Sequence, residues 1–274
     1  MPAGALALAL AAAVVHAVWN LLLARADDTE AATAVALGLS VLLFALPALL
    51  LWEIDSGAWP YVAASAAFEV GYVATLSGGL RRGELSVVYP LARGSAPVLV
   101  LAVSAGALGA ATSGLQVAGV LLVAAGVVLV RGLRRPEEPV AAALALACGA
   151  CIAGYTVVDS YGLDHAAALP YLWVVMALTA AVYVPAVARA RGGTSLRAAL
   201  RLDTAVAAVL FFGAYLLVLA ALRLAEPGPV AAVRETSIVI ATALGALILR
   251  ERVTPARAAG AAVVVAGAAL IALS

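Results

Sequence analysis

The chain has 274 residues, of which 66% are hydrophobic and only 11% are charged, and its net charge at pH 7 is +1. A soluble domain is about half apolar and about a quarter charged, and a domain of this size could not bury so large an apolar fraction. The composition therefore excludes a soluble globular fold and predicts a protein that lies in a lipid bilayer. The small net charge gives no electrostatic basis for binding nucleic acid.

Long apolar runs follow one another with only short charged or Gly/Pro-rich breaks. A spanning helix needs about 20 apolar residues. The first run, residues 2–23, is too long for the core of a signal peptide and has no basic residue before it, so we interpret it as a spanning helix. In chain order we expect transmembrane helices near residues 3–24, 31–52, 60–80, 85–107, 113–131, 139–161, 166–188, 203–223, 228–249 and 255–273.

The two halves of the chain repeat each other. A shift of 141 residues places Arg93 on Arg234, Gly119 on Gly260 and Gly126 on Gly267. If each half has five helices, an odd number, the second half must enter the membrane from the opposite side. We therefore expect an all-α integral membrane fold of ten transmembrane helices, arranged as two inverted five-helix repeats at residues 1–135 and 136–274. Inverted repeats are a common architecture of alternating-access transporters, whose sites lie near the middle of the membrane.

The arginines predict an orientation. Apart from Arg93 and Arg234, which fall inside helices, every arginine except Arg223 lies in or beside a loop that follows an odd-numbered helix. The positive-inside rule places those loops in the cytoplasm and both chain termini outside.

Polar residues inside the first and third helices are candidates for a site. His16, Trp19 and Asn20 share one face of the first helix, where they form either a hydrogen-bonded cluster between helices or one wall of a substrate cavity. Glu69 and Tyr72 lie one turn apart in the third helix, and Glu69 falls near the bilayer centre. A carboxyl group at this depth is either neutralised by an arginine or protonated, and it couples transport if it exchanges its proton when substrate binds.

The fourth and ninth helices each combine an arginine with helix-breaking residues. Arg93 lies between Pro90 and Pro97, and Arg234 follows the Pro-Gly-Pro run at 227–229. Interrupted helices at corresponding positions of two repeats point to a transporter's binding site. A guanidinium group there suits a carboxylate, phosphate or phosphonate.

The alternative for both arginines is permanent ion pairing, Arg93 with Glu69 or Asp159 and Arg234 with Glu235. The sixth helix adds Tyr155 and Asp159, which is either a cavity residue or an interfacial one, and the eighth adds Tyr215. The complete set of candidate substrate-binding residues is His16, Asn20, Glu69, Tyr72, Tyr89, Arg93, Tyr155, Asp159, Tyr215, Arg234 and Glu235.

No motif indicates catalysis or a cofactor. The sequence has no P-loop, no HExxH and no GxSxG, so neither ATP-driven pumping nor the common metallo- and serine hydrolase chemistries find support. Cys148 and Cys151 are too few for a zinc site. We expect a protein that is not an enzyme, binds no metal or cofactor, and uses an ion gradient as its energy source.

Several segments together resemble the drug/metabolite transporter (DMT) superfamily, in its EamA branch. They are HAVWN at 16–20, RGELSVVYPLAR at 82–93, GYTVVD at 154–159, RETS at 234–237 and LRER at 249–252. The resemblance implies ten helices in two inverted repeats, and transport of small metabolites, often as proton-driven export. The chain departs from the family at 108–111, which lacks the charges of the turn at 249–252. It also departs in its arginine distribution, because the superfamily usually keeps both termini in the cytoplasm.

The sequence thus predicts a proton-coupled secondary transporter in the bacterial plasma (inner) membrane that exports a small polar metabolite, either anionic or zwitterionic. Its expected partners are the solute, protons and the lipid bilayer, without nucleic acid, and it is expected to be a monomer or homodimer. One alternative is an exporter of organic cations, with Glu69 and Asp159 as counter-charges and aromatic side chains as cation–π partners. Two others are a membrane-embedded enzyme acting on a lipid-linked substrate, with His16 in acid–base chemistry, and a structural subunit.

Overall fold

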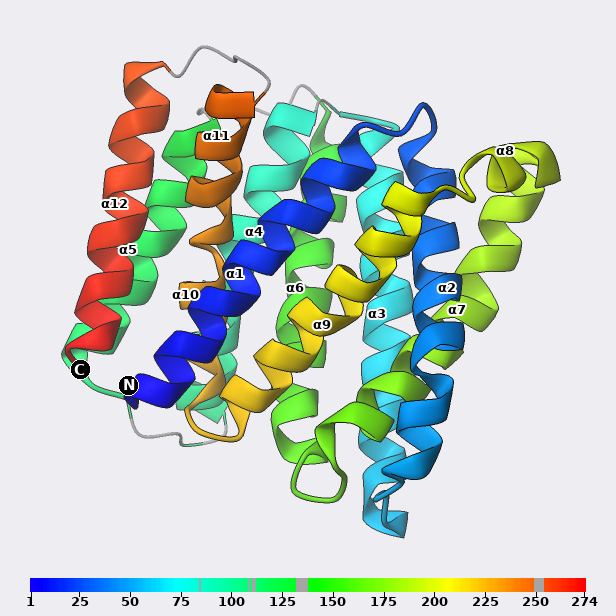
Figure 1. Cartoon of the computed structure of the whole chain (residues 1–274). Coiled ribbons are helices and arrows are strands. Elements are labelled where there is room, and N and C mark those ends of the chain that lie inside the picture. Colours follow the sequence, from blue (N-terminus) through cyan, green and yellow to red (C-terminus); the bar gives the residue numbers. More distant parts are fainter. Residues whose placement is uncertain (84, 108, 110–111, 132–137, 249–253) are drawn as a thin grey trace.

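The computed structural model describes residues 1–83, 85–107, 109, 112–131, 138–248 and 254–274 (Figure 1). Within these ranges the regular structure is helical, apart from one antiparallel β-bridge between Ile54 and Ala166. The α-helices are α1 (Ala3–Ala24), α2 (Thr29–Leu50), α3 (Trp59–Leu80), α4 (Leu85–Leu101), α5 (Gly114–Arg131), α6 (Pro139–Gly162), α7 (Ala168–Arg191), α8 (Gly193–Ala198), α9 (Leu202–Leu222), α10 (Pro227–Arg234), α11 (Ser237–Ile248) and α12 (Pro255–Ala272). A short 3₁₀ helix precedes α3 at Ser56–Ala58, and a π-helical segment continues α4 at Ala102–Ala107.

The helices confirm the multi-pass membrane architecture. Seven helices in the described ranges are long and apolar enough to cross a bilayer: α1, α2, α4 with its π-helical extension, α6, α7, α9 and α12. Each of the other three predicted segments also contains helix, but α5 is shorter, α3 carries Glu69 and several small polar residues, and α10 and α11 are separate helices. The segment predicted at 228–249, with its Pro-Gly-Pro interruption, consists of two helices, because the chain breaks between Arg234 and Ser237.

Helices from the two halves of the chain interleave. Contacts join α1 to α9, α3 to α6, α2 to α7 and α5 to α12, and each of these pairs combines one helix from each half. Figure 1 shows both chain ends on the same side of the molecule and α5 and α12 side by side at one edge. The arrangement makes the centre of the molecule a boundary shared by both halves.

Glycines bring α5 and α12 into backbone contact. A Cβ added to Gly126 would lie 2.7 Å from the backbone nitrogen of Val264 and 2.8 Å from the carbonyl oxygen of Gly260. One added to Gly119 would lie 2.8 Å from the carbonyl oxygen of Gly267. Small residues are enriched where membrane helices pack, because they let backbones approach closely. This contact explains the seven-residue glycine spacing in both helices.

Proline and glycine shape the two central interrupted segments. α4 contains Pro90 and Pro97 and passes into π-helix at Ala102. α10 begins at Pro227 and ends after eight residues, and Glu235 is its C-cap. Such irregular backbone is tolerated at membrane depth only where protein or water surrounds it. The side chains of α10 and most of those between residues 88 and 101 of α4 are buried, whereas Ala102 and Val103 of the π-helical segment are exposed.

The α5–α12 contact predicts unequal effects for two Gly→Ala substitutions. We expect Gly126→Ala to lower the melting temperature in detergent, since overpacking costs about 1–3 kcal/mol and the obstructing atoms are backbone. Gly213→Ala in α9 is the control, because nothing lies within 4 Å of its added Cβ and alanine favours helix over glycine. Equal melting temperatures for the two variants would contradict the close contact.

Candidate functional site

A buried ion pair joins the two interrupted segments. The Arg93 guanidinium contacts both carboxylate oxygens of Glu235, with Nη2–Oε1 at 3.0 Å and Nε–Oε2 at 3.1 Å. The two side chains are 5% and 1% exposed. The Nε–Oε2 contact is a charge-assisted hydrogen bond, whereas Nη2 and Oε1 lie at ion-pair distance without hydrogen-bond geometry. Arg93 therefore pairs with an acid of the opposite half, and the partners that the sequence suggested for it, Glu69 and Asp159, are not its partners here.

The break after α10 places two charges at one helix end. Glu235 is the C-cap, where the helix dipole disfavours an anion, and Arg234 lies in the last turn, where the dipole favours a cation. The guanidinium of Arg93 compensates the unfavourable position of Glu235. The geometry of the break thus depends on a side chain from α4.

Arg234 is buried and incompletely bonded. Its side chain is in the protein interior with 6% exposure, and within the described part of the chain its Nε has no hydrogen-bond partner. Its electrostatic neighbours include Tyr155, Arg93 and Glu235. A buried donor without a partner is costly, so this nitrogen is available to an acceptor that binds from elsewhere.

Asp159 is a buried acceptor rather than an interfacial residue. It is 1% exposed and accepts hydrogen bonds from the hydroxyls of Tyr171 at 2.9 Å and Tyr215 at 2.6 Å. Glu69 is also buried, with Asp159 and Tyr215 among its electrostatic neighbours. The sequence did not predict a role for Tyr171, which lies close to the start of α7.

These groups form a buried charge cluster, defined here as Glu69, Arg93, Asp159, Arg234 and Glu235. Aromatic rings surround it, since Tyr155 contacts both Tyr72, at 6.3 Å between centroids, and Tyr215, at 5.8 Å. Two arginines face three acids, so the cluster is neutral when one carboxyl group carries a proton. A low-dielectric interior favours that neutral state over a net charge.

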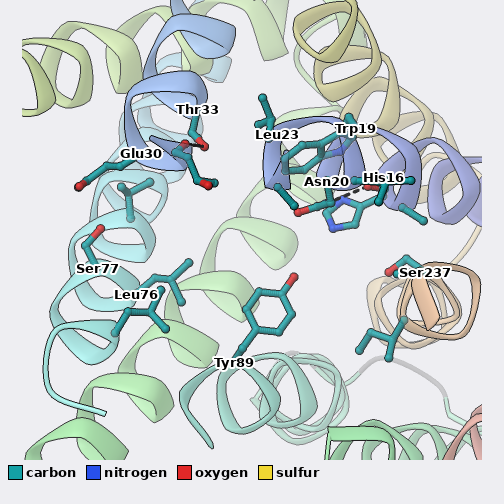
Figure 2. Close-up of a pocket in the computed structure, with 18 of the residues that line it drawn as sticks. His16, Trp19, Asn20, Leu23, Glu30, Thr33, Leu76, Ser77, Tyr89 and Ser237 are labelled. Atoms are coloured by element: carbon teal, nitrogen blue, oxygen red, sulfur yellow. Dashed lines mark hydrogen bonds between the residues drawn. The ribbon is translucent and has the colours of Figure 1, made fainter. Parts of the chain in front are cut away.

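Beside the cluster lies a cavity of about 1020 Å³ (Figure 2). Four predicted site residues line it: His16, Asn20, Tyr72 and Tyr89. The other predicted residues, Glu69, Arg93, Tyr155, Asp159, Tyr215, Arg234 and Glu235, do not line it. They are its close neighbours along the chain, because Glu69 precedes Tyr72 by one turn and Arg93 follows Tyr89 by one turn. The structure thus divides the predicted site residues into two groups, those that line the cavity and those that do not.

Side chains from four helices converge on the closed end of the cavity. Figure 2 shows the His16 ring and the Tyr89 hydroxyl directed into the same space, with Ser237 beside it. His16 packs edge-on against Trp19, at 4.9 Å between centroids, and the Asn20 amide donates to the His16 carbonyl oxygen at 2.8 Å. The closed end therefore offers neutral hydrogen-bonding groups and an aromatic wall to a ligand. Ser237 is a lining residue that the sequence did not single out.

The mouth of the cavity carries charges of both signs. Asp27, Asp28 and Glu30 lie at the α1–α2 connection, and Arg81 and Arg191 lie at the ends of α3 and α7. Arg191 is paired with Glu30, with Nη2–Oε2 at 2.7 Å. The mouth thus opens on the face that the arginine-rich loops occupy.

The opposite face has a smaller cavity of about 600 Å³, which Asp164, Arg223 and Glu226 help to line. Arg223 does not extend freely into the membrane interface. Its Nη2 donates to the carbonyl oxygens of Leu163 at 3.3 Å and Ala166 at 2.5 Å. Across the described residues, no group of three or more His, Cys, Asp or Glu side chains could hold a metal ion.

Fold and site together define a helical, multi-pass membrane protein whose larger cavity ends beside a buried charge cluster. The family model described as the EamA-like transporter family matches residues 140–273. This part of the chain, close to half of it, belongs to that family of membrane transporters, which is part of the drug/metabolite transporter superfamily. The resemblance inferred from the sequence motifs is thereby confirmed.

A solved structure, described only as "Crystal structure of protein", shares the fold. Its TM-score is 0.79 at 18% sequence identity, and the match covers 100% of this chain and 98% of the other. At that identity the likeness concerns the fold alone. Among curated proteins, no relative matches this chain.

The ion pair predicts that the effects of substituting Arg93 and Glu235 on stability are not additive. Arg93→Gln leaves Glu235 as an unpaired buried charge and should cost about 3–5 kcal/mol of stability, whereas Arg93→Gln combined with Glu235→Gln should recover most of that loss. The measurement is the melting temperature of the purified full-length protein. Arg191→Gln is the control, because it removes an exposed ion pair that contributes little. Additive effects of the two substitutions would refute the interaction.

Proposed function

We propose that the protein is a secondary transporter that exports a small polar metabolite by alternating access, coupled to proton movement. The observation that carries this proposal is the position of the cavity. It opens on one face, penetrates to Tyr72, Tyr89 and Ser237, and ends one helical turn from the buried charge cluster. Ionisable groups inside a membrane are costly and are commonly retained for transport.

The contacts between helices support two inverted five-helix repeats. Exchanging the halves replaces α1 by α6, α3 by α9, and α4 by α10 and α11. The α1–α9 contact then corresponds to the α6–α3 contact, and the α4–α6 contact corresponds to the contacts of α10 and α11 with α1. The same exchange relates Gly119–Gly267 to Gly260–Gly126. Helices α5 and α12 run antiparallel in that contact, so the two-fold axis is perpendicular to them. For helices that cross a bilayer, such an axis lies in the membrane plane.

The charge distribution supports export. The cavity opens between Asp27, Arg81 and Arg191, on the face that holds nearly all loop arginines. The positive-inside rule assigns that face to the cytoplasm. The solute would thus load from the cytoplasm, and release would require the opposite end to open.

The two buried guanidinium groups support an anionic or zwitterionic solute, such as an amino-acid-like or phosphonate-like metabolite. The Nε of Arg234 lacks a partner in the described residues, and Arg93 lies near it with a carboxylate already bound. A solute carboxylate or phosphonate would engage Arg234 and compete with Glu235 for Arg93. The cavity volume of about 1020 Å³ accommodates such a solute together with water.

The excess of acids over arginines in the cluster supports proton coupling. One carboxyl group must hold a proton for neutrality, and an entering anion that displaces an internal acid changes which group holds it. Glu69 is our first candidate, because it has no arginine at salt-bridge distance among the described residues. Its neighbour Asp159 already accepts two tyrosine hydroxyls.

A second candidate function, export of organic cations, is favoured by the cavity lining. Trp19, Tyr72 and Tyr89 present aromatic rings to the cavity, and Asp27 and Glu30 lie at its mouth. Aromatic faces attract organic cations. In this case the cluster acids would serve as counter-charges.

A thermal-shift screen of the full-length protein against metabolite pools distinguishes the two substrate classes. A ligand present at about 100 times its Kd stabilises the folded state by about 2.7 kcal/mol. For an anionic ligand we expect this stabilisation to vanish in the Arg93→Gln/Glu235→Gln protein, which keeps the cluster's net charge. Arg201→Gln, at an exposed site, should leave it intact. A cationic ligand whose stabilisation survives the double substitution would favour the second function.

Glu69→Gln tests coupling in proteoliposomes loaded with the ligand found in that screen. We expect a loss of accumulation driven by a pH gradient, while exchange of labelled for unlabelled solute continues, because the neutral amide mimics a permanently protonated carboxyl group. Glu53→Gln, in the exposed α2–α3 connection, is the control. If accumulation persists in the Glu69→Gln protein, Glu69 is not the coupling residue.

A further inference from the structure

Two arginines occupy the same C-cap position at the ends of the third spanning helix of each half, one residue out of the 141-residue register that relates Arg93 to Arg234. Arg81 is the C-cap of α3, with φ −74° and ψ −16°, and Arg223 is the C-cap of α9, with φ −72° and ψ −16°. In both, the backbone N–H donates to the carbonyl oxygen four residues earlier, Ser77 or Leu219. The two side chains thus start from the same local geometry at opposite ends of the molecule.

Their side chains differ in what they bind. Arg223 spans from the end of α9 to the α6–α7 connection, where its Nη2 donates to the carbonyl oxygens of Leu163 and Ala166. Arg81 lies at the cavity mouth and is exposed, and among the described residues it makes no hydrogen bond or ion pair. The arginine at the smaller cavity is engaged, and its counterpart at the mouth of the larger cavity makes no such contact among the described residues.

The loop that Arg223 holds also has a counterpart at the mouth. Leu163 is the C-cap of α6, and its counterpart Arg25 is the C-cap of α1. Ala166 precedes the N-cap of α7, and its counterpart Asp27 precedes the N-cap of α2. The last carbonyl oxygens of a helix lack partners inside the helix, and a guanidinium group suits them because it presents several donors in one plane. The carbonyl oxygens equivalent to those held by Arg223 are therefore those of Arg25 and Asp27.

When the halves are exchanged, a pair of helices in contact corresponds to a pair that the larger cavity separates. α9 contacts α6, whereas their counterparts α3 and α1 contribute opposite walls of the cavity, α3 through Leu76 and Ser77 and α1 through His16 and Asn20 (Figure 2). Closing the mouth would bring the end of α3 toward the end of α1.

We propose that Arg81 and Arg223 are alternating latches for the two ends of the transport pathway, a role that rests on the proposed alternating access. In the present state Arg223 holds the α6–α7 connection at the end of the molecule that has the smaller cavity. When the mouth closes, Arg81 donates to the carbonyl oxygens of Arg25 and Asp27 and holds the α1–α2 connection in the same way, while Arg223 releases its acceptors. Asp27 adds a carboxylate that Arg81 meets only in that state.

The test follows the accessibility of the cavity from the arginine-rich face. Ala241→Cys, which lies in the cavity wall, serves as the reporter in a protein carrying Cys148→Ala and Cys151→Ala. Its reaction with a membrane-impermeant maleimide is timed in vesicles of known sidedness. Arg81→Gln should raise the labelling rate, because it removes a contact of the mouth-closed state, and Arg223→Gln should lower it. Loss of charge-assisted hydrogen bonds changes the equilibrium between the mouth-open and mouth-closed states by about tenfold. Because each arginine stabilises a different state, the two labelling rates should move in opposite directions wherever both states are populated.

Arg82→Gln is the matched control, since Arg82 carries the same charge on the same loop but, among the described residues, its side chain donates only back to α3, to Gly78 at 3.3 Å. Arg81→Lys retains a cationic donor and should fall between wild type and Arg81→Gln. Equal labelling of the Arg81→Gln and Arg82→Gln proteins, or a shift in the same direction for Arg81→Gln and Arg223→Gln, would overturn the latch. Because labelling needs no substrate, opposite shifts without any measurable transport would retain the latch and reject the proposed function.

Discussion

The pairing of Arg93 with Glu235 is the constraint around which the centre of this protein is organised. A guanidinium group in the middle of an apolar chain is tolerable only if an acid meets it with good geometry. The two contacts at 3.0 and 3.1 Å meet that requirement. They connect α4 to the break between α10 and α11, so a buried ion pair joins the two halves of the chain. Any motion that separates the halves at this depth must replace one of these partners.

The break in the ninth segment follows from the same requirement. Had α10 continued without interruption into α11, Glu235 would lie within a regular helix instead of at its C-terminal end. The break places Arg234 and Glu235 side by side at the end of a short helix, where Arg93 takes the acid and leaves the neighbouring guanidinium with an unused donor. The unused donor belongs to a residue three positions before Ser237, which lines the larger cavity, so under the proposed function a solute in that cavity would satisfy it. The unpaired donor of the charge cluster and the capacity to bind a ligand thus result from the same arrangement.

The sequence was sufficient for the helices and insufficient for their partners. Segment positions follow from apolar length, and the Pro-Gly-Pro run before Arg234 indicated the interruption, although not that it would separate two helices. The partner of Arg93 could not be predicted, because Glu69, Asp159 and Glu235 are all acids at suitable depth and only the packing of α4 against α10 selects among them. Tyr171 was missed for a related reason. It lies at a helix start, where tyrosine usually marks the membrane interface, and only the approach of α7 to α6 brings its hydroxyl to Asp159.

Under the proposed two-fold arrangement, two similar halves could form two states of equal connectivity, and the state described here is not symmetric. The larger cavity opens at one face and the smaller cavity at the other. Two differences between the halves accompany this asymmetry. α9 contacts α6 while α3 and α1 contribute to opposite walls of the larger cavity, and Arg223 is bound while Arg81 makes no contact of that kind among the described residues. The α5–α12 contact, which maps onto itself when the halves are exchanged, does not have to change between the states. Under the proposed function, a fixed pair of helices at one edge and exchangeable contacts at the two ends would be sufficient for alternating access.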